Sequence, residues 1–292
     1  MKFSYETLDV FTETRYQGNP LAIVTVPTDL RTSLTQKHKQ AIAKEFNFSE
    51  TVFLHLEGAT DEIPIDIFTP RQELPFAGHP TIGSAHYLLK MKGLNVKALR
   101  TKAGSIPIAV DSASGYVRAE IPHNIRIHRA QATSELTSDA IPYVSIVRGM
   151  TFLLVPLPTV EVLAKATSRI AGSGPTTVLD EGWQEGFVGT YYYVPQGGDD
   201  KGRTKLRVRM QGSREDPATG SAASALTSYL ALQEPQQKGA GPFRFALTQG
   251  VEMGSPSEIF VEILRTERGD GIASVFLSGS AMEIMEGTLR ID

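Results

Sequence analysis

Two stretches that lie far apart in the chain follow one pattern. Glu-Leu-Pro-Phe-Ala-Gly at residues 73–78 and Glu-Asp-Pro-Ala-Thr-Gly at residues 215–220 share Glu, Pro and Gly at the same places. The pair Tyr-Leu follows each stretch at the same distance, at 87–88 and at 229–230. An alternating apolar run that favours a strand precedes each copy, and each copy opens a helix. Two Gly- and Pro-rich loops can agree by chance, but the shared order of strand, motif and helix favours an internal duplication.

The other segments are expected to be short strands with few helices. Residues 33–46 are expected to form a helix with Ser33 as its N-cap and Asn47 as its stop. The segment 129–142 has weak periodicity and is expected to be a connection without regular structure. The strands expected from alternating or apolar runs are 3–11, 21–26, 51–54, 63–67, 187–194 and 204–210.

The length of 292 residues exceeds the usual range of a single hydrophobic core. Together with the duplication, this length predicts two domains of the α/β (α+β) class. The expected first half is residues 1–126, with the C-terminal strand 280–292 as a candidate to complete it. The expected second half is residues 127–279.

The composition argues against several classes of function. A net charge of -3 and a pI of about 6.1 argue against nucleic acid or an anionic membrane surface as the main partner. The N-terminal residues contain no apolar signal core and no apolar run is long enough to span a bilayer, so a cytoplasmic protein is expected. The chain contains no cysteine, which excludes disulfides, thiolate metal sites and sulfur nucleophiles.

The two motif copies each place a glycine and small polar residues at the start of an expected helix. Unpaired N–H groups and the positive end of the helix dipole make such a terminus attractive to anions. If both termini face one cleft, the expected ligand is a small anionic substrate. A capped helix without a ligand is the simpler alternative for either terminus.

No motif for a cofactor or a metal is found. His79 and His86 are seven residues apart and could share a helix face, but no third ligand follows at a suitable spacing. Gly172-Ser173-Gly174 lacks the preceding strand and the later glycine of a dinucleotide-binding loop, and no phosphate-binding loop with its lysine is present. We therefore expect neither a cofactor nor a metal.

Four segments together resemble the phenazine biosynthesis PhzF-like isomerase family. They are Gly18–Pro20, Ser49–Phe53, Glu73–Gly83 and Glu215–Ala222, and the resemblance extends from about residue 3 to residue 285. It implies the fold of diaminopimelate epimerase, in which two similar halves each wrap a curved mixed sheet around a central helix, with the site between them. It also implies a homodimer. Ser255 departs from the pattern, because the family often has Arg there, and this puts details of the pocket or its closure in question.

The resemblance implies that Glu50 is the acid/base and that His79, Asp216 and Ser221 line the substrate site. Glu50 could instead be an exposed charge at a strand edge. Asp216 could hold a substrate hydroxyl or amine, or stabilise a helix dipole. Ser221 could cap its helix, contact the substrate, or do both. The candidate catalytic residues are Glu50, His79 and Asp216, and the candidate substrate-binding residues are Gly18, Asn19, Gly78, Pro80, Thr81, Thr219, Gly220 and Ser221.

The residues before the two motif glycines limit the chemistry. Thiol-dependent epimerases of this fold carry Cys there, whereas this chain has Ala77 and Thr219, so a two-thiol racemase is excluded. What remains is a single carboxylate that takes a proton from one carbon of a small cyclic or unsaturated carboxylate and returns it to another. The resemblance alone implies trans-2,3-dihydro-3-hydroxyanthranilate as a substrate. Two alternatives stay open: a binding protein without useful turnover, and an epimerase with a second non-thiol base such as Asp216.

Overall fold

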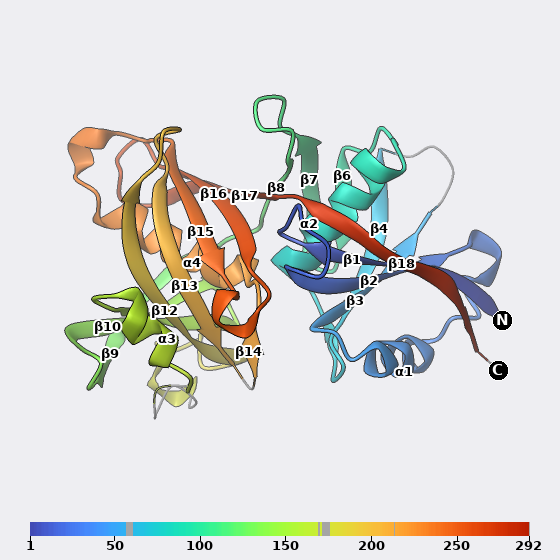
Figure 1. Cartoon of the computed structure of the whole chain (residues 1–292), viewed down its shortest axis with the longest axis horizontal. Coiled ribbons are helices and arrows are strands. Elements are labelled where there is room, and N and C mark those ends of the chain that lie inside the picture. The colour runs from blue at the N-terminus through green and yellow to red at the C-terminus, as the bar shows by residue number, and fades with distance from the viewer. Residues whose placement is uncertain (57–60, 169, 171–175, 213, 292) are drawn as a thin grey trace. The chain divides into compact units, whose positions relative to one another are not determined.

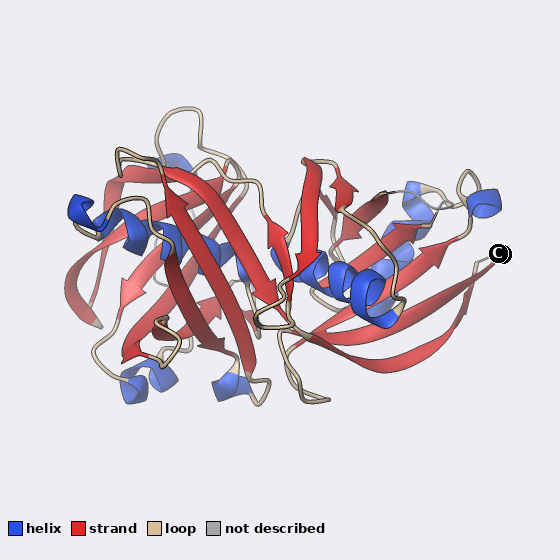
Figure 2. Cartoon of the chain, turned by 90° about the horizontal axis from the view of Figure 1, so that it is seen from above, coloured by secondary structure: helices blue, strands red, loops and turns tan. Residues whose placement is uncertain are grey.

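The structure is a computed structural model that describes residues 1–292 except 57–60, 169, 171–175, 213 and 292 (Figure 1). Contacts between Cα atoms divide the chain into two compact units. Unit 1 comprises Met1–Ile121 and Ser278–Asp292, and unit 2 comprises Pro122–Leu277. The division expected from the sequence lay after residue 126. Strands are the main regular elements of both units (Figure 2).

Among its described residues, unit 1 contains two α-helices, α1 and α2, a 3₁₀ turn at Thr28–Leu30 and a set of strands. A π-helical turn, Tyr87–Met91, continues α2. The helices and strands are β1 (Lys2–Val10), β2 (Asn19–Val26), α1 (Gln36–Phe46), β3 (Glu50–His55), β4 (Glu62–Phe68), β5 (Glu73–Leu74), α2 (Gly78–His86), β6 (Ala98–Thr101), β7 (Gly104–Val110), β8 (Val117–Glu120) and β18 (Ala281–Arg290).

The strands of unit 1 pair in the order β18–β1–β2–β3–β4–β6–β7–β8, with β5 paired to β4. The β2–β3 and β4–β6 pairs are parallel and the others are antiparallel. Helix α2 packs against the neighbouring strands β18, β1, β2 and β3 at one end of this order and against β8 at the other end. The sheet therefore curves around α2, and every residue of the helix is buried. This arrangement fixes the start of α2 relative to the neighbouring strand ends.

Gly83 allows this close packing of α2 on the sheet. A Cβ atom at this position would lie 2.4 Å from Cδ2 of Leu21 and 2.9 Å from Cγ2 of Val10. Distances this short force the neighbouring side chains to move, so the helix can approach β1 and β2 closely only with glycine here.

The last residue of α2, His86, makes the stability of unit 1 sensitive to acid. Burial, reinforced by the charge of Lys90, lowers the pKa of His86 from 6.5 to about 4. Protonation therefore favours the unfolded chain, and stability present above pH 6.5 is lost as the pH falls towards 4. We expect the free energy of unfolding to fall by about 1–2 kcal/mol between pH 7 and pH 5, after allowance for solvent screening. Urea titrations at several pH values would measure this loss, and His86→Gln should make it smaller; an equal loss in the variant would contradict the assignment.

Unit 2 contains its own long strands and a long central helix. Strand β17 (Ile272–Gly279) spans the division between the two units. The helices and strands are β9 (Arg126–Ser134), β10 (Thr137–Val147), β11 (Met150–Pro156), α3 (Val160–Lys165), β12 (Phe187–Gly198), β13 (Thr204–Gln211), β14 (Glu215–Asp216), α4 (Gly220–Gln233), β15 (Phe243–Gln249) and β16 (Ser257–Arg265).

The strands of unit 2 repeat the order found in unit 1. They pair as β9–β10–β11–β12–β13–β15–β16, with β14 paired to β13. The parallel pairs are β11–β12 and β13–β15, at the places of β2–β3 and β4–β6. Helix α4 packs against β10, β11, β15 and β16, as α2 does within unit 1. The predicted architecture of two similar halves, each with a mixed sheet around a central helix, is confirmed, and Gly78 and Gly220 are the first residues of the two central helices.

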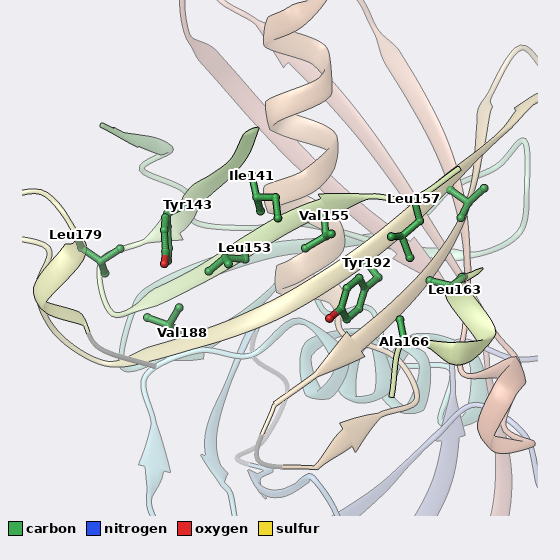
Figure 3. Close-up of a cluster of buried hydrophobic side chains, with 11 residues drawn as sticks. Ile141, Tyr143, Leu153, Val155, Leu157, Leu163, Ala166, Leu179, Val188 and Tyr192 are labelled. Carbon is green, nitrogen blue, oxygen red and sulfur yellow. The ribbon is translucent and has the colours of Figure 1, made fainter. Parts of the chain in front are cut away.

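A second layer covers the other side of the unit 2 sheet. Leu153 and Val155 of β11 and Tyr192 of β12 pack with Leu163 of α3 in a cluster of buried side chains (Figure 3). Tyr191, the neighbour of Tyr192, is fully buried outside this cluster. This agrees with the alternation of side chains between the two faces of a strand.

Two local expectations were wrong. The segment 129–142 is not an irregular connection, because β9 and β10 pair over most of it. Strand β9 has mostly exposed or half-buried side chains, so its polar residues hide the alternation. The first helix begins at Gln36 rather than residue 33, and Thr35 is its N-cap, with Thr35 Oγ1 accepting a hydrogen bond from the His38 N–H at 3.2 Å. Asn47 ends this helix with a left-handed backbone, as expected.

No helix in the described part of the chain is both long and apolar enough to cross a membrane.

Candidate active site

Glu50 and His79 form a hydrogen-bonded pair in unit 1. Glu50 is the first residue of β3, and His79 is the second residue of α2. His79 Nδ1 lies 2.8 Å from Glu50 Oε2. The side chain of His79 is 4% exposed and that of Glu50 is 17% exposed. The histidine is thus enclosed, whereas the carboxylate keeps limited access to solvent and is not the exposed surface charge that the simpler alternative required.

The hydrogen bonding of this pair defines where a proton can be held. An ionised carboxylate only accepts hydrogen bonds, so Nδ1 of His79 donates the shared proton to Glu50. In a neutral imidazole, Nε2 then carries the lone pair. Nε2 of His79 is buried and has no hydrogen-bond partner among the described residues. Because buried polar atoms are normally paired, Nε2 is a candidate contact for a ligand.

Gly18 and Asn19 shape the chain next to Glu50. Asn19 is buried at the start of β2, and its Oδ1 accepts a hydrogen bond from Ser49 Oγ at 2.8 Å. This bond fixes the residue directly before Glu50. Gly18 has a φ of +78°, and a Cβ there would lie 2.4 Å from the carbonyl oxygen of Val10. Only glycine fits such a position without strain.

The first turn of α2 contains three more candidate residues, Gly78, Pro80 and Thr81, all buried. Ala77 is the N-cap, and no side chain caps the helix. Thr81 Oγ1 donates to the carbonyl of Ala77 at 2.8 Å. The threonine hydroxyl therefore does not cap the backbone N–H groups of the first turn. Pro80 is the third residue of α2. The first four N–H groups of a helix have no partner within it, so a proline is accepted at the third position too.

Asp216 and Thr219 are joined in unit 2. Thr219 Oγ1 donates to Asp216 Oδ2 at 2.6 Å. Thr219 is the N-cap residue of α4, and no side chain caps this helix. Ser221, one of the alternatives for a cap, is instead the second helical residue after Gly220, at the position that His79 has in α2. Ser221 is 8% exposed. The cap alternative for Ser221 is therefore wrong, while its contact with a substrate stays a prediction.

The Glu shared by the two motif copies makes an ion pair in each unit. Glu73 pairs with Lys102. Glu215 accepts two hydrogen bonds from the buried Arg209, at 2.6 and 2.9 Å. Arg207 pairs with Glu252 at 2.7 Å. Both arginines of β13 thus pair with carboxylates. The motif Glu anchors the short strand before each central helix.

Gln249 is a site residue that sequence reasoning did not single out. It is fully buried at the end of β15, and its side-chain amide contacts both Asp216 and Thr219. Its only signal in the sequence is its place directly before Gly250, six residues before Ser255. Ser255 lies in the same turn and donates its N–H to the carbonyl of Gly250 at 2.9 Å.

A serine–histidine–aspartate cluster elsewhere in unit 2 is not a nucleophilic site. His128 Nε2 lies 2.8 Å from Ser145 Oγ, and the backbone N–H of Asp180 donates to His128 Nδ1 at 3.2 Å. Burial lowers the pKa of His128, so the ring is neutral and Nε2 carries its proton. Nε2 therefore donates to Ser145 Oγ, which also shares a hydrogen bond of 2.6 Å with Thr151 Oγ1. A histidine that already donates to the serine cannot act as its base.

A metal site is not formed by the described residues. None of their His, Cys, Asp and Glu side chains come together in a group of three or more that could hold an ion.

The candidate residues thus fall into one group in each unit. Unit 1 contains Gly18, Asn19, Glu50, Gly78, His79, Pro80 and Thr81. Unit 2 contains Asp216, Thr219, Gly220 and Ser221. The substrate contacts of these residues stay predictions.

Comparison with known proteins bears on the family and the fold of this chain. The family model of the phenazine biosynthesis-like proteins, PhzC-PhzF, matches residues 8–287. An uncharacterized isomerase of Mesorhizobium japonicum is 31% identical over 308 residues, covering 99% of both chains. The trans-2,3-dihydro-3-hydroxyanthranilate isomerase of Pseudomonas aeruginosa is 29% identical over 294 residues, covering 97% of this chain and 98% of that one.

Solved structures confirm the predicted fold class. The phenazine biosynthesis protein of the PhzF family from Bacillus anthracis superposes with a TM-score of 0.79 at 23% identity, and all of both chains is covered. A hydroxyproline epimerase from Agrobacterium vitis has a TM-score of 0.63 at 14% identity, with 99% of this chain and 92% of that chain covered. The fold is therefore shared with epimerases as well. The chain belongs to the phenazine biosynthesis-like PhzC-PhzF family.

Proposed function

We propose that this protein is an isomerase that moves a proton within a small cyclic or unsaturated carboxylate, with Glu50 as its acid/base. The observation that supports the proposal most is the pair of Glu50 and His79. A partly accessible carboxylate is bonded to a buried imidazole whose Nε2 has no partner in the described part of the chain. Relatives similar over almost the whole chain are named isomerases, which supports the reaction class.

In the proposed reaction, a carboxylate oxygen of Glu50 takes a proton from a substrate carbon. The electron pair of the broken C–H bond becomes part of a new carbon–carbon double bond, and the original double bond shifts by one position. Glu50 then returns the proton to the far carbon of the allylic system, so that the atoms balance without any other reactant. His79, bonded to Glu50 through Nδ1, orients the carboxylate and offers Nε2 to the substrate or to the proton.

The negative charge that develops on the substrate needs stabilisation. The first-turn N–H groups of α2, which no side chain caps, are suited to this role. We further propose that the group in unit 2 contacts substrate, with Asp216 holding a hydroxyl or amine and with Gly220 and Ser221 contributing the start of α4. Independence from metals and cofactors, the homodimer and the cytoplasmic location stay predictions.

The first test is to incubate the protein with small cyclic and unsaturated carboxylates in D₂O and to follow them by NMR. The substrate named for the Pseudomonas aeruginosa relative, trans-2,3-dihydro-3-hydroxyanthranilate, belongs in this panel. We expect the double bond of one compound to shift, with deuterium at the carbon that receives the proton. Deuterium at a stereocentre without a shift of the double bond would instead indicate an epimerase, and binding without exchange would indicate a binding protein.

A further inference from the structure

The side-chain amide of Gln249 is completely engaged in hydrogen bonds although the residue is 0% exposed. Its Oε1 accepts from the backbone N–H of Thr219 at 3.3 Å and from the hydroxyl of Tyr191 at 2.9 Å. Its Nε2 donates to the backbone carbonyl of Asp216 at 2.7 Å and to Thr219 Oγ1 at 3.1 Å. One buried amide thus links β12, β14 and the start of α4.

The partners of this amide fix its orientation. A backbone N–H can only donate and a backbone carbonyl can only accept, so Oε1 must face Thr219 N and Nε2 must face the carbonyl of Asp216. Nε2 then has its second proton for Thr219 Oγ1. The threonine oxygen, which accepts there, directs its own proton to Asp216 Oδ2, 2.6 Å away. Because Nε2 rather than Oε1 faces Thr219 Oγ1, the threonine proton is left for Asp216 Oδ2.

Tyr191 completes this chain of donors. Burial, with a smaller contribution from the charge of Asp216, raises the pKa of the Tyr191 hydroxyl well above its usual value. The hydroxyl consequently keeps its proton and acts as a donor to Gln249.

The backbone beside Gln249 holds the amide at this place. Gly250 has a φ of +76°, and a Cβ atom there would lie 2.7 Å from the carbonyl oxygen of Pro217 and 2.4 Å from that of Ser255. The turn after β15 can therefore press against the motif segment only with glycine at this position.

We propose that Gln249, supported by Tyr191, is a positioning residue that acts through Thr219 to orient the carboxylate of Asp216 for the substrate. This inference rests on the proposed function, because it assigns a role in the reaction to the polar chain, meaning the hydrogen bonds that run from Tyr191 through Gln249 and Thr219 to Asp216. It assigns no contact between Gln249 and the substrate itself.

The test is a double-mutant cycle with Gln249→Met and Asp216→Asn, measured as kcat/KM on the substrate identified in D₂O. Met has nearly the size of Gln but no hydrogen-bonding amide. We expect Gln249→Met to lower kcat/KM by about 10- to 100-fold in the wild-type background, the range for hydrogen bonds that involve a charged group. In the Asp216→Asn background the same substitution should lower it by less than about 3-fold, since residues that act as a unit are not additive. Equal losses in both backgrounds would overturn the inference, because a general structural defect does not depend on Asp216.

Tyr191→Phe is a milder variant in case Gln249→Met folds poorly. It removes one hydrogen bond to the amide and should lower kcat/KM by about 3- to 10-fold. Tyr192→Phe is the matched control, because Tyr192 is the neighbour of Tyr191 in β12. Its hydroxyl donates to the carbonyl of Ser168 at 2.9 Å and not to the Gln249 amide. This control should keep wild-type kcat/KM, and an equal loss in both tyrosine variants would contradict the role of Tyr191.

Hydrogen exchange at the Thr219 amide separates this inference from the proposed function. Gln249→Met should accelerate exchange there by about 10-fold or more, whereas Tyr192→Phe should not change it. If Glu50→Gln keeps turnover, the proposed function fails, and the exchange experiment still tests the polar chain. If turnover depends on Glu50 but Gln249→Met keeps wild-type kcat/KM, only the inference about Gln249 fails.

Discussion

Glu50→Gln is expected to reduce kcat by about 10²–10⁴-fold or more, the usual contribution of a positioned acid/base group. Glutamine keeps the shape of the side chain and can still bond to His79, but it cannot carry a proton between two carbons. Substrate affinity should remain near the wild-type value, because the start of α2 and the imidazole stay in place. The measurements are steady-state turnover and the dissociation constant of the same compound.

Two further variants make this result specific. Glu62→Gln is the matched control: Glu62 is the first residue of β4, as Glu50 is of β3, and it pairs with the exposed Arg100. It should leave turnover unchanged. His79→Ala should weaken binding as well as rate, a different signature from that of Glu50→Gln. Near wild-type turnover in Glu50→Gln would rule out the one-carboxylate mechanism and make His79 or Asp216 the next candidate for the base.

Arg265→Ala is expected to lower the free energy of unfolding by about 3–5 kcal/mol. This is the range for removing the charged side chain from a buried, hydrogen-bonded interaction. The side chain is 2% exposed, and its guanidinium donates to four backbone carbonyls. These carbonyls are those of Ala231, Glu234, Pro235 and Gly239, at and beyond the end of α4. The guanidinium also stacks on Phe243, 4.5 Å from the ring centre.

The effect is large because alanine cannot replace the hydrogen bonds that the Arg265 guanidinium donates to these carbonyls. The last carbonyls of a helix have no partner within it and carry the negative end of its dipole. Without the guanidinium, these four carbonyls lose a hydrogen-bond donor, and a cavity remains beside Phe243. Unfolding in urea would measure the change.

Arg244→Ala is the control for the Arg265 variant. Arg244 belongs to the neighbouring strand β15, is about half exposed, and pairs with Glu262 at 2.8 Å. Exposed pairs contribute little, so its loss should cost less than about 1 kcal/mol. Arg265→Lys should fall between the two, because an ammonium cannot reach carbonyls in several directions as the planar guanidinium does. A loss below about 1 kcal/mol in Arg265→Ala would contradict the argument.

Much of the architecture was predictable because it depends on residue types at fixed spacing. The motif copies begin at Glu73 and Glu215, and the structure starts a central helix five residues later in each unit. Glycine and proline limit the backbone locally, so their pattern survives in the sequence whatever surrounds it. The choice of Glu50 as acid/base likewise followed from the motif resemblance and the absence of cysteine. Its role in the reaction is still a prediction.

Local signals failed where neighbours in space decided the outcome. Strand β9 has few buried side chains, so its alternation was too weak to predict it. The helix start at Gln36 depended on a hydrogen bond of Thr35 with His38, and Ser33 was an equally good residue type for the cap. In both cases the sequence offered several compatible conformations, and the contacts of the folded chain selected one.

The site depends most on tertiary structure. Glu50 and His79 are 29 residues apart, Thr219 and Gln249 are 30 apart, and Tyr191 and Gln249 are 58 apart. The periods of helices and strands relate only residues a few positions apart, so they cannot predict these contacts. The order of strand pairing brings the residues within hydrogen-bond distance. The sequence by itself therefore determined the duplicated α/β architecture and the types of residue available for chemistry. Which imidazole meets the carboxylate, and which amide holds Asp216, was decided by the curvature of each sheet around its central helix.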